Sequence, residues 1–413
     1  MTLVWLACVP DFPDRTFDTA PSADTQADTS PLDTAPPDTA PPDTAPPDTA
    51  PPATDPPSAT RLVADDPCAR AGEVVASRVT AGEAFLLVGG PGLLDGSCEQ
   101  AGQVWELDLA ELPASFEDPL ELGLSVAGGG ALVDLSDGFA VGDPRRDGEG
   151  AALIVDASTT VLSGEADVFA EGAALDWDGG HLYVGAPSDS ISGGQVVAVT
   201  RDSKALSDGE TLTADAAESF GRVLAMVGDL GGDGARSLAI GAPDAAGGAG
   251  LLFVVETGWA DQAAVADVGQ VLSGKAGLGS AVATADLDGD GIAQLVVAVD
   301  GAVLVLDDLD LGTPLATFSA PGYDGFGASL VLNDLDRDGE PELLVGAPGA
   351  SVVLRAPADE GVHELDPGHV LLEGDADELG SSLVDIQTKD GAWLVAGAPG
   401  AEGHAGAVEL LAY

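Results

Sequence analysis

The feature that most constrains this chain is a short apolar run that ends in Gly-Ala-Pro and returns at a regular interval. The complete form occurs at residues 185–187, 241–243, 346–348 and 397–399, and shortened forms occur at 90–91, 142–144 and 299–300. Neighbouring copies lie about 50 residues apart, which is the length of one four-stranded propeller blade. Seven copies predict seven blades. Because a blade cannot bury both faces alone, the sheets must stack around a closed ring.

The composition agrees with an all-β array. The chain has 56 glycines and many short runs of Val, Leu and Ala, and no long stretch has the period of a helix. We therefore expect almost no helix between about residue 70 and the C-terminus, and a single domain there. The apolar runs at 182–184 and 343–345 are predicted to be inner, buried strands that end at the Gly-Ala-Pro turns.

Three hairpins carry a regularly spaced acidic turn. The fullest copy contains Asp334, Asp336 and Asp338, followed by Gly339 and Glu342. Alternating carboxylates converge when the backbone curls, and a glycine permits the turn. Three hard oxygen donors in five residues favour Ca²⁺.

An EF-hand begins with the same spacing, but it needs a bidentate Glu at the twelfth position and flanking helices. The twelfth residue counted from Asp334 is Val345, and the residues after Glu342 form an apolar run typical of a strand. Glu342, at the ninth position, is the better closing ligand. The loop is therefore predicted to lie within a β-hairpin.

Two other hairpins repeat the acidic turn with weaker ligand sets. In one of them the predicted ligands are Asp286, Asp288, Asp290 and the neutral amide of Gln294. In the other only two remain, Asp229 and Asp233, because Gly231 and Ser237 occupy the third and ninth positions. For all three loops the alternative is a plain Asp/Gly-rich turn without an ion.

The remaining blades lack this ligand pattern. Blade 3 has a shortened turn at 176–180, and blade 2 has a tight hairpin turn at 135–138. In blade 7, Asp385 is followed at the third and fifth positions by Gln387 and Lys389, and the lysine would occupy the place of the cation. We expect no metal in blades 1, 2, 3 or 7.

These features resemble the FG-GAP repeat of integrin α-subunit propellers. Phe-Gly stands at 220–221 and 326–327, each ahead of an acidic loop and a Gly-Ala-Pro stop. The resemblance implies a seven-bladed β-propeller over residues 61–413. It also implies Ca²⁺ ligands at positions one, three, five and nine of each acidic loop, with a backbone carbonyl at position seven. Ions bound in this way would be structural rather than catalytic.

The N-terminus looks like the remnant of a bacterial lipoprotein signal. Residues 1–8 are apolar and end at Cys8, which would be the lipidated residue. No Lys or Arg precedes the apolar run, so we expect the true start to lie further upstream. The alternative is an untargeted soluble N-terminus with a stray cysteine.

Residues 9–60 are predicted to be a disordered, extended tether. They consist largely of Asp, Thr, Ala and Pro, with Asp-Thr-Ala-Pro-Pro repeated at 33–37, 38–42, 43–47 and 48–52. Proline fixes φ and removes hydrogen-bond donors, and the aspartates repel one another. A lipid anchor followed by such a spacer would hold a domain away from the membrane.

Cys68 and Cys98 are the other two cysteines, and both are expected in the first blade, on either side of a strand at 84–88. In an exported protein an even pair of this spacing indicates a disulfide. The alternative is two free thiols in a cytosolic protein.

The charge balance restricts the partners. Seventy acidic against 14 basic residues give a formal net charge of −56, which argues against nucleic acid and against anionic membranes. Membrane contact is expected only through the N-terminal lipid. The four histidines, at 181, 363, 369 and 404, occupy different parts of the repeat, and no arrangement of side chains indicates catalysis.

We therefore expect a non-enzymatic, monomeric, calcium-binding propeller for adhesion or recognition of an extracellular protein or glycan. Its location would be the bacterial outer membrane or cell surface through a lipid anchor, or the exterior if it is not anchored. The alternatives are an extracellular glycan lyase or hydrolase built on a propeller, and a purely structural envelope protein.

Overall fold

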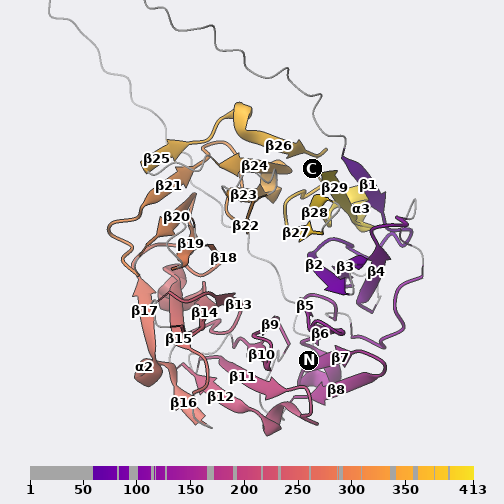
Figure 1. The fold of residues 1–413 in the computed structure, drawn as a ribbon, viewed down its shortest axis with the longest axis vertical. Coiled ribbons are helices and arrows are strands. Elements are labelled where there is room, and N and C mark those ends of the chain that lie inside the picture. The colour runs from indigo at the N-terminus through magenta and orange to yellow at the C-terminus, as the bar shows by residue number, and fades with distance from the viewer. Residues whose placement is uncertain are drawn as a thin grey trace, which may run out of the picture. The chain divides into compact units, whose positions relative to one another are not determined.

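Seven β-sheets surround a central axis, and the first and last strands of the described chain lie side by side in one of them (Figure 1). In this computed structural model the described residues are 59–413 except 81–82, 93–100, 113–115, 117, 126–127, 165–171, 189–192, 215–216, 231–233, 260–261, 286, 288–291, 308, 335–340, 357–360, 376 and 389–390. All of them belong to one compact unit, Thr54–Tyr413. The predicted Cys8 anchor and nearly all of the predicted 9–60 tether lie outside the described residues.

The innermost strands contact one another around the whole ring. They are β2 (Val74–Thr80), β5 (Leu132–Asp134), β9 (Ala174–Trp177), β13 (Val223–Val227), β18 (Val282–Ala285), β22 (Ser329–Asn333) and β27 (Leu383–Gln387). Each packs against the next, and β27 packs against β2. The predicted all-β, seven-bladed propeller is therefore confirmed.

The second strands of the blades form the core. They are β3 (Glu83–Gly90), β6 (Phe139–Asp143), β10 (His181–Ala186), β14 (Ser237–Ala242), β19 (Gln294–Val299), β23 (Glu342–Ala347) and β28 (Ala392–Ala398). Every residue of β14, β19 and β23 is buried, because a neighbouring blade covers each face of these sheets. Leu238 and Ile240, for example, pack toward blade 3, whereas Ala239 packs toward blade 5.

The runs at 182–184 and 343–345 lie in β10 and β23, and they are buried as predicted. They are also inner strands, because β10 and β23 lie second from the axis and end at the Gly-Ala-Pro turns. β9 and β22 lie nearer to the axis, and each pairs with the apolar strand that follows it. Position within a sheet depends on strand pairing, which an apolar run alone does not specify.

The outer part of each sheet consists of a third strand and, in six blades, a fourth. The third strands are β4 (Gln103–Asp108), β7 (Ala151–Val155), β11 (Gln195–Thr200), β15 (Leu251–Glu256), β20 (Ala302–Leu306), β24 (Val352–Ala356) and β29 (Ala407–Ala412). The fourth strands of blades 2 to 6 are β8 (Thr159–Ser163), β12 (Glu210–Thr213), β17 (Gly269–Ser273), β21 (Ala316–Ser319) and β26 (Val370–Glu373). In its described part, the sheet of blade 1 has only three strands.

Blade 7 takes its fourth strand from the other end of the chain. β1 (Thr60–Val63) pairs antiparallel with β29, so that Arg61 lies opposite Glu409. Leu62 is buried, and the Arg61 guanidinium contacts Glu409 at 2.9 Å and Asp377 at 2.6 Å. The sequence predicts that the ring must close, but it does not identify the strand that closes it.

Two blades extend back onto their predecessors. β16 (Gln262–Ala264), from blade 4, pairs in parallel with β12 of blade 3, and β25 (Gly361–Glu364), from blade 6, pairs in parallel with β21 of blade 5. Both additions cover the outer edge of a sheet, where unpaired backbone groups would otherwise be exposed.

Helices in the described residues are short, as expected. They are α1 (Ala245–Gly248), α2 (Val265–Val268) and α3 (Ala401–His404), with 3₁₀ turns η1 (Arg146–Gly148), η2 (Leu206–Asp208), η3 (Pro348–Ala350) and η4 (Pro367–His369). In the part of the chain that the structure describes, none has the length and apolar character needed to cross a membrane.

Glycine sets the distance between neighbouring blades. A Cβ on Gly185 of β10 would lie 2.0 Å from the carbonyl oxygen of Gly221, at the start of blade 4. Gly221 has φ 88°, and its N–H donates to Gly241 of its own blade at 3.2 Å. Residues 89, 142, 241, 346 and 397 are also glycines that meet a glycine carbonyl of the next blade. Blade 5 is the exception, because Ala298 occupies this position.

Cys68 takes part in a disulfide bond. Cys98 lies outside the described residues, so the pairing of Cys68 with Cys98 stays a prediction. The strand predicted between them is part of β3.

Candidate functional site

The three acidic loops occupy equivalent places in their blades. They join β13 to β14, β18 to β19 and β22 to β23, which in each case are the innermost strand and the second strand. Equivalent hairpins of stacked blades emerge on the same side of the ring. The loops of blades 4, 5 and 6 therefore share one face of the propeller.

Hydrogen bonds join neighbouring loops on this face. The N–H of Ala293 donates to the carbonyl of Asp229 at 3.3 Å, which connects blade 5 with blade 4. The side chain of Gln387, in blade 7, donates to the carbonyl of Asp334 at 2.9 Å. In blade 4, Arg236 donates to the carbonyl of Asp178 at 3.0 Å. These hydrogen bonds therefore connect blade 3 with blade 4, blade 4 with blade 5, and blade 6 with blade 7.

In the blade 6 loop, the described residues place two of the four predicted ligands. Glu342 begins β23, pairs with Asn333 and is buried. One of its carboxylate oxygens accepts a hydrogen bond from the Arg355 guanidinium on β24. Asp334 directly follows the last residue of β22, whereas Asp336 and Asp338 lie outside the described residues.

Arg355 is a site residue that the spacing of the loop did not predict. It is the third residue after the start of β24, and it reaches Glu342 across the sheet. A metal ion that used Glu342 would share this carboxylate with a fixed positive charge. The alternation of strands could have placed Arg355 near the loop, but the partner of its guanidinium is visible only in the structure.

In the blade 5 loop, the amide of Gln294 is fully buried at the start of β19. Its side-chain oxygen accepts the N–H of Leu287 at 2.6 Å, so the amide oxygen is directed toward the loop. Its nitrogen lies 3.5 Å from the carboxylate of Asp307 on the other side. The three predicted aspartate ligands, Asp286, Asp288 and Asp290, lie outside the described residues.

The blade 4 loop shows how the first aspartate closes the turn. The carboxylate of Asp229 accepts the N–H of Gly234 at 2.6 Å, and Gly234 has φ 86°. This bond curls the backbone around the first carboxylate. Asp233 lies outside the described residues, and the buried Ser237 occupies the ninth position.

The chemistry of these donors fits a hard cation. The described residues supply carboxylates at Asp229, Asp334 and Glu342 and an amide oxygen at Gln294, and the carboxylate of Asp229 already accepts an N–H from across its turn. Among the described residues, no group of three His, Cys, Asp or Glu is arranged to hold a metal. Six of the ten predicted ligand residues are outside that set, so these ligand assignments stay predictions.

The shortened turn of blade 3 has protein partners for its carboxylate. Asp178 accepts the N–H groups of Gly180 and His181, both at 2.7 Å, and the hydroxyl of Tyr183 at 2.8 Å. Burial alone would raise the pKa of Asp178, but these hydrogen bonds outweigh it and lower the pKa below its usual value. Burial and the bond to Asp178 raise the pKa of Tyr183.

The aspartate in the tight turn of blade 2 and three of the histidines also contact other side chains of the protein. Asp137, in the predicted hairpin turn, forms an ion pair with Arg201 of blade 3. His181 lies 3.6 Å from Asp178, His369 lies 2.9 Å from Asp366, and His363 stacks on Phe318.

Residues 326–362 match the FG-GAP repeat family. This segment of the chain is therefore similar to an FG-GAP repeat. It begins at the Phe-Gly pair, runs through β22, the acidic loop, β23 and β24, and ends at the start of β25. The matched segment thus contains the fullest acidic loop of the propeller, together with the Gly-Ala-Pro sequence that follows it.

Proposed function

We propose that this propeller is a non-enzymatic, calcium-binding recognition module that is displayed outside the cell. The observation that carries the proposal is the common face of the three acidic loops, one of which lies in the segment that matches the FG-GAP repeat family. Its ligand would be a protein or a glycan. A formal net charge of −56 makes nucleic acids and anionic membranes poor partners and favours a monomer.

The metal would bind most tightly in the blade 6 loop. Asp334, Asp336, Asp338 and Glu342 supply four carboxylates there, whereas Gln294 supplies a neutral amide in the blade 5 loop. Bound Ca²⁺ would neutralise these crowded charges. The blade 4 loop, with Asp229 and Asp233 alone, would be the weakest of the three.

The calcium proposal is tested by the melting temperature of the full chain in EDTA and in millimolar Ca²⁺ at one ionic strength. An ion that binds only the folded state raises the free energy of unfolding by about 2.7 kcal/mol when its free concentration is a hundred times Kd. For a domain of this size, that corresponds to a rise of about 4 °C. Asp336→Ala should lose more of the rise than Asp288→Ala, because its loop has the charged closing ligand.

The matched control is Asp137→Ala, in the turn where Arg201 is the partner of the carboxylate. This variant should keep the full Ca²⁺-dependent rise even if its melting temperature in EDTA changes. An unchanged melting temperature of the parent in Ca²⁺ would mean that the loops are only acidic hairpins.

The surface location rests on Cys8 and on the disulfide predicted between Cys68 and Cys98. Mass spectrometry of the native protein should find a lipid on Cys8 and no alkylatable thiol at the other two positions. An unmodified Met1 together with two free thiols would place the protein in the cytosol.

The recognition role is tested with a glycan array and with pull-down from extracellular material, each with and without Ca²⁺. Calcium-dependent capture of a glycan or a protein would support the proposal. Turnover of a glycan on the array would favour a lyase or hydrolase instead.

A further inference from the structure

Asp176 lies at a position that is apolar in the other six blades. It belongs to β9 and pairs with Tyr183 of β10. Tyr183 lies two residues before Gly185, the glycine that meets the next blade. The residues with the same pairing in the other blades are Ala76, Val133, Ala225, Ala283, Val331 and Val384. A carboxylate has therefore replaced a small apolar side chain at a joint between two blades.

The carboxylate of Asp176 connects blade 3 to blade 4. One oxygen accepts the backbone N–H of Met226, in the innermost strand β13 of the next blade. The other oxygen accepts the N–H of Trp177 at 2.7 Å. Leu224 and Met226 of β13 pack into the apolar cluster that fills this joint. Asp176 itself is half-buried, and its carboxylate joins the two strands beside this apolar cluster, where a charge is less well solvated than in water.

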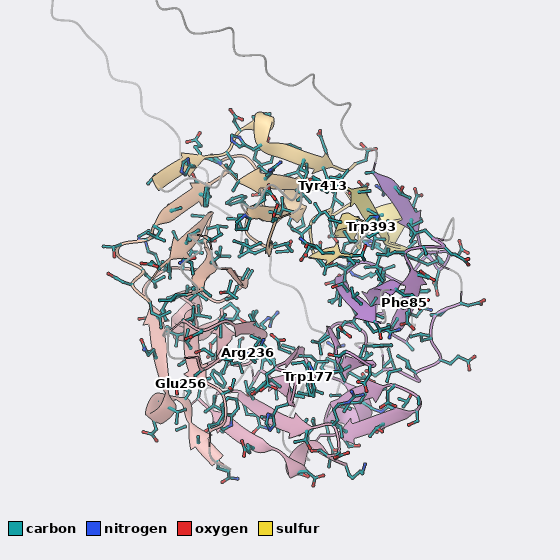
Figure 2. All side chains as sticks on the ribbon, in the orientation of Figure 1. Phe85, Trp177, Arg236, Glu256, Trp393 and Tyr413 are labelled. Atoms are coloured by element: carbon teal, nitrogen blue, oxygen red, sulfur yellow. The ribbon has the colours of Figure 1, made fainter. Side chains whose placement is uncertain are left out.

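Few charged groups face this carboxylate. Asp178 lies on the same turn and Arg236 comes from the blade 4 loop, while β13 and β14 contribute no charged side chain. β10 contributes two titratable side chains near Asp178: the hydroxyl of Tyr183 donates to its carboxylate, and His181 lies 3.6 Å from it. On the other side, β5 and β6 pack against β9 and contribute Asp134 and Asp143. Figure 2 shows Trp177 and Arg236 on the adjoining blades.

Burial raises the pKa of Asp176 from its usual value to about 6, and the nearby Asp178 adds to this effect. The hydrogen bonds from Met226 and Trp177 and the charge of Arg236 act in the opposite direction and are outweighed. In the unfolded chain the carboxyl would titrate near 3.8. Between these two values the folded state binds a proton that the unfolded state does not.

We propose that Asp176 makes the joint between blades 3 and 4 sensitive to protons, so that the propeller is held together more firmly in mildly acidic solution. The added stability is absent above about pH 6.5, grows as the pH falls through 6, and is complete below the value of the unfolded chain. A protonated carboxyl keeps one oxygen to accept the N–H of Met226 and no longer carries a charge among apolar side chains.

The experiment compares the melting temperature of the full chain with that of Asp176→Asn from pH 4.5 to pH 8, in EDTA at constant ionic strength. Asparagine keeps one acceptor and has no charge at any pH. The variant should melt about 2–4 °C higher than the parent at pH 7.5, and this difference should shrink through a midpoint near pH 6. The other carboxylates titrate in both proteins, so their effect cancels when the two melting temperatures are subtracted at each pH.

The matched control is Asp178→Asn, two residues away. The pKa of Asp178 is lowered, so its ionised form stabilises the fold and the variant should melt lower than the parent at pH 7.5. Hydrogen exchange at Met226 gives a second measurement, and in the parent its protection should rise as the pH falls through 6 relative to the variant. A difference in melting temperature that is constant from pH 4.5 to pH 8 would overturn the proposal, as would an Asp176→Asn variant that is less stable than the parent at pH 7.5.

Discussion

At the scale of single residues, one glycine in the second strand of six of the seven blades controls how close the next blade comes. At Gly185 the neighbouring carbonyl fills the space where a side chain would begin. Ala298 shows that blade 5 tolerates a methyl group, and there the residue opposite is Gly327, where an added Cβ would still lie 3.2 Å from that methyl. The Gly-Ala-Pro stops are therefore packing signals as much as turn signals.

Gly185→Ala should lower the free energy of unfolding by about 3 kcal/mol, because its Cβ would force blades 3 and 4 apart. The control is Gly180→Ala, where the new Cβ would lie 3.5 Å from Asp178 in an exposed turn. Chemical denaturation measures both. Equal stability of the two variants would contradict this account of the joint.

Arg355 changes what the ninth position of the blade 6 loop can do. Glu342 is buried and its charge is balanced by Arg355, so removal of the arginine leaves a buried carboxylate without that partner. Arg355→Ala should therefore lower the melting temperature in EDTA, and it should enlarge the Ca²⁺-dependent rise because an ion would regain the whole carboxylate.

The control for this variant is Arg201→Ala, which removes the partner of Asp137 on the same face. It should leave the Ca²⁺-dependent rise unchanged. A rise that is smaller in Arg355→Ala than in the parent would show that the arginine supports the loop instead of competing with the ion.

The spacing of the loop residues predicted where Asp334, Glu342 and Gln294 would lie relative to the strands, because a hairpin has only one way to alternate its side chains. It could not predict Arg355, since the partner comes from another strand and depends on side-chain direction. Asp176 was also missed, because its apolar counterparts can be recognised only after the strands of all seven blades are aligned.

At the scale of elements, four residues close the ring. β1 covers the edge of β29 and buries Leu62, and Arg61 holds two carboxylates from blades 6 and 7. Without β1, the last sheet would lose its outer strand and expose the apolar residues beneath it.

A chain that starts at residue 64 should be less stable than one that starts at residue 54, by about 5 kcal/mol, from the loss of buried Leu62, the backbone pairing and the ion pairs. Both chains lack the Asp-Thr-Ala-Pro-Pro repeats, so they differ only near β1. Urea denaturation measures the difference. A shift of less than 1 kcal/mol would mean that the seventh blade closes without this strand.

The sequence predicted the inner hairpins, because each has its own apolar run and turn. It predicted neither β1 nor the added strands β16 and β25. Residues 60–63 follow a low-complexity segment and contain only two apolar side chains, and 262–264 is too short and too weakly apolar to indicate a strand. These strands form because the edge of another sheet is available to them.

At the scale of the whole molecule, repulsion between carboxylates opposes folding. The chain has 70 acidic side chains and only 14 lysines and arginines. In the described residues, Arg61, Arg70 and Arg201 each form ion pairs with two carboxylates. The periodic stops were enough to predict seven blades in spite of this charge, because burial between sheets depends on the apolar pattern and not on the surface.

Raising NaCl from about 20 mM to 500 mM in EDTA should increase the melting temperature by several degrees, since salt shortens the range of repulsion to a few ångströms. The same concentrations of KCl should give the same increase, because screening does not depend on a specific site. A lower melting temperature at high salt would indicate that the ion pairs outweigh the repulsion.

The position of β1 also determines when folding of the propeller can be completed. Arg61 and its partner Glu409 are separated by 348 residues, so the last blade has to wait until the ribosome has delivered β29. Bringing these ends together costs about 5 kcal/mol of chain entropy, which six completed blades must offset before the seventh can form. A polypeptide released before residue 407 has no strand for β1 to join and keeps an open sheet edge, which is free to pair with another chain.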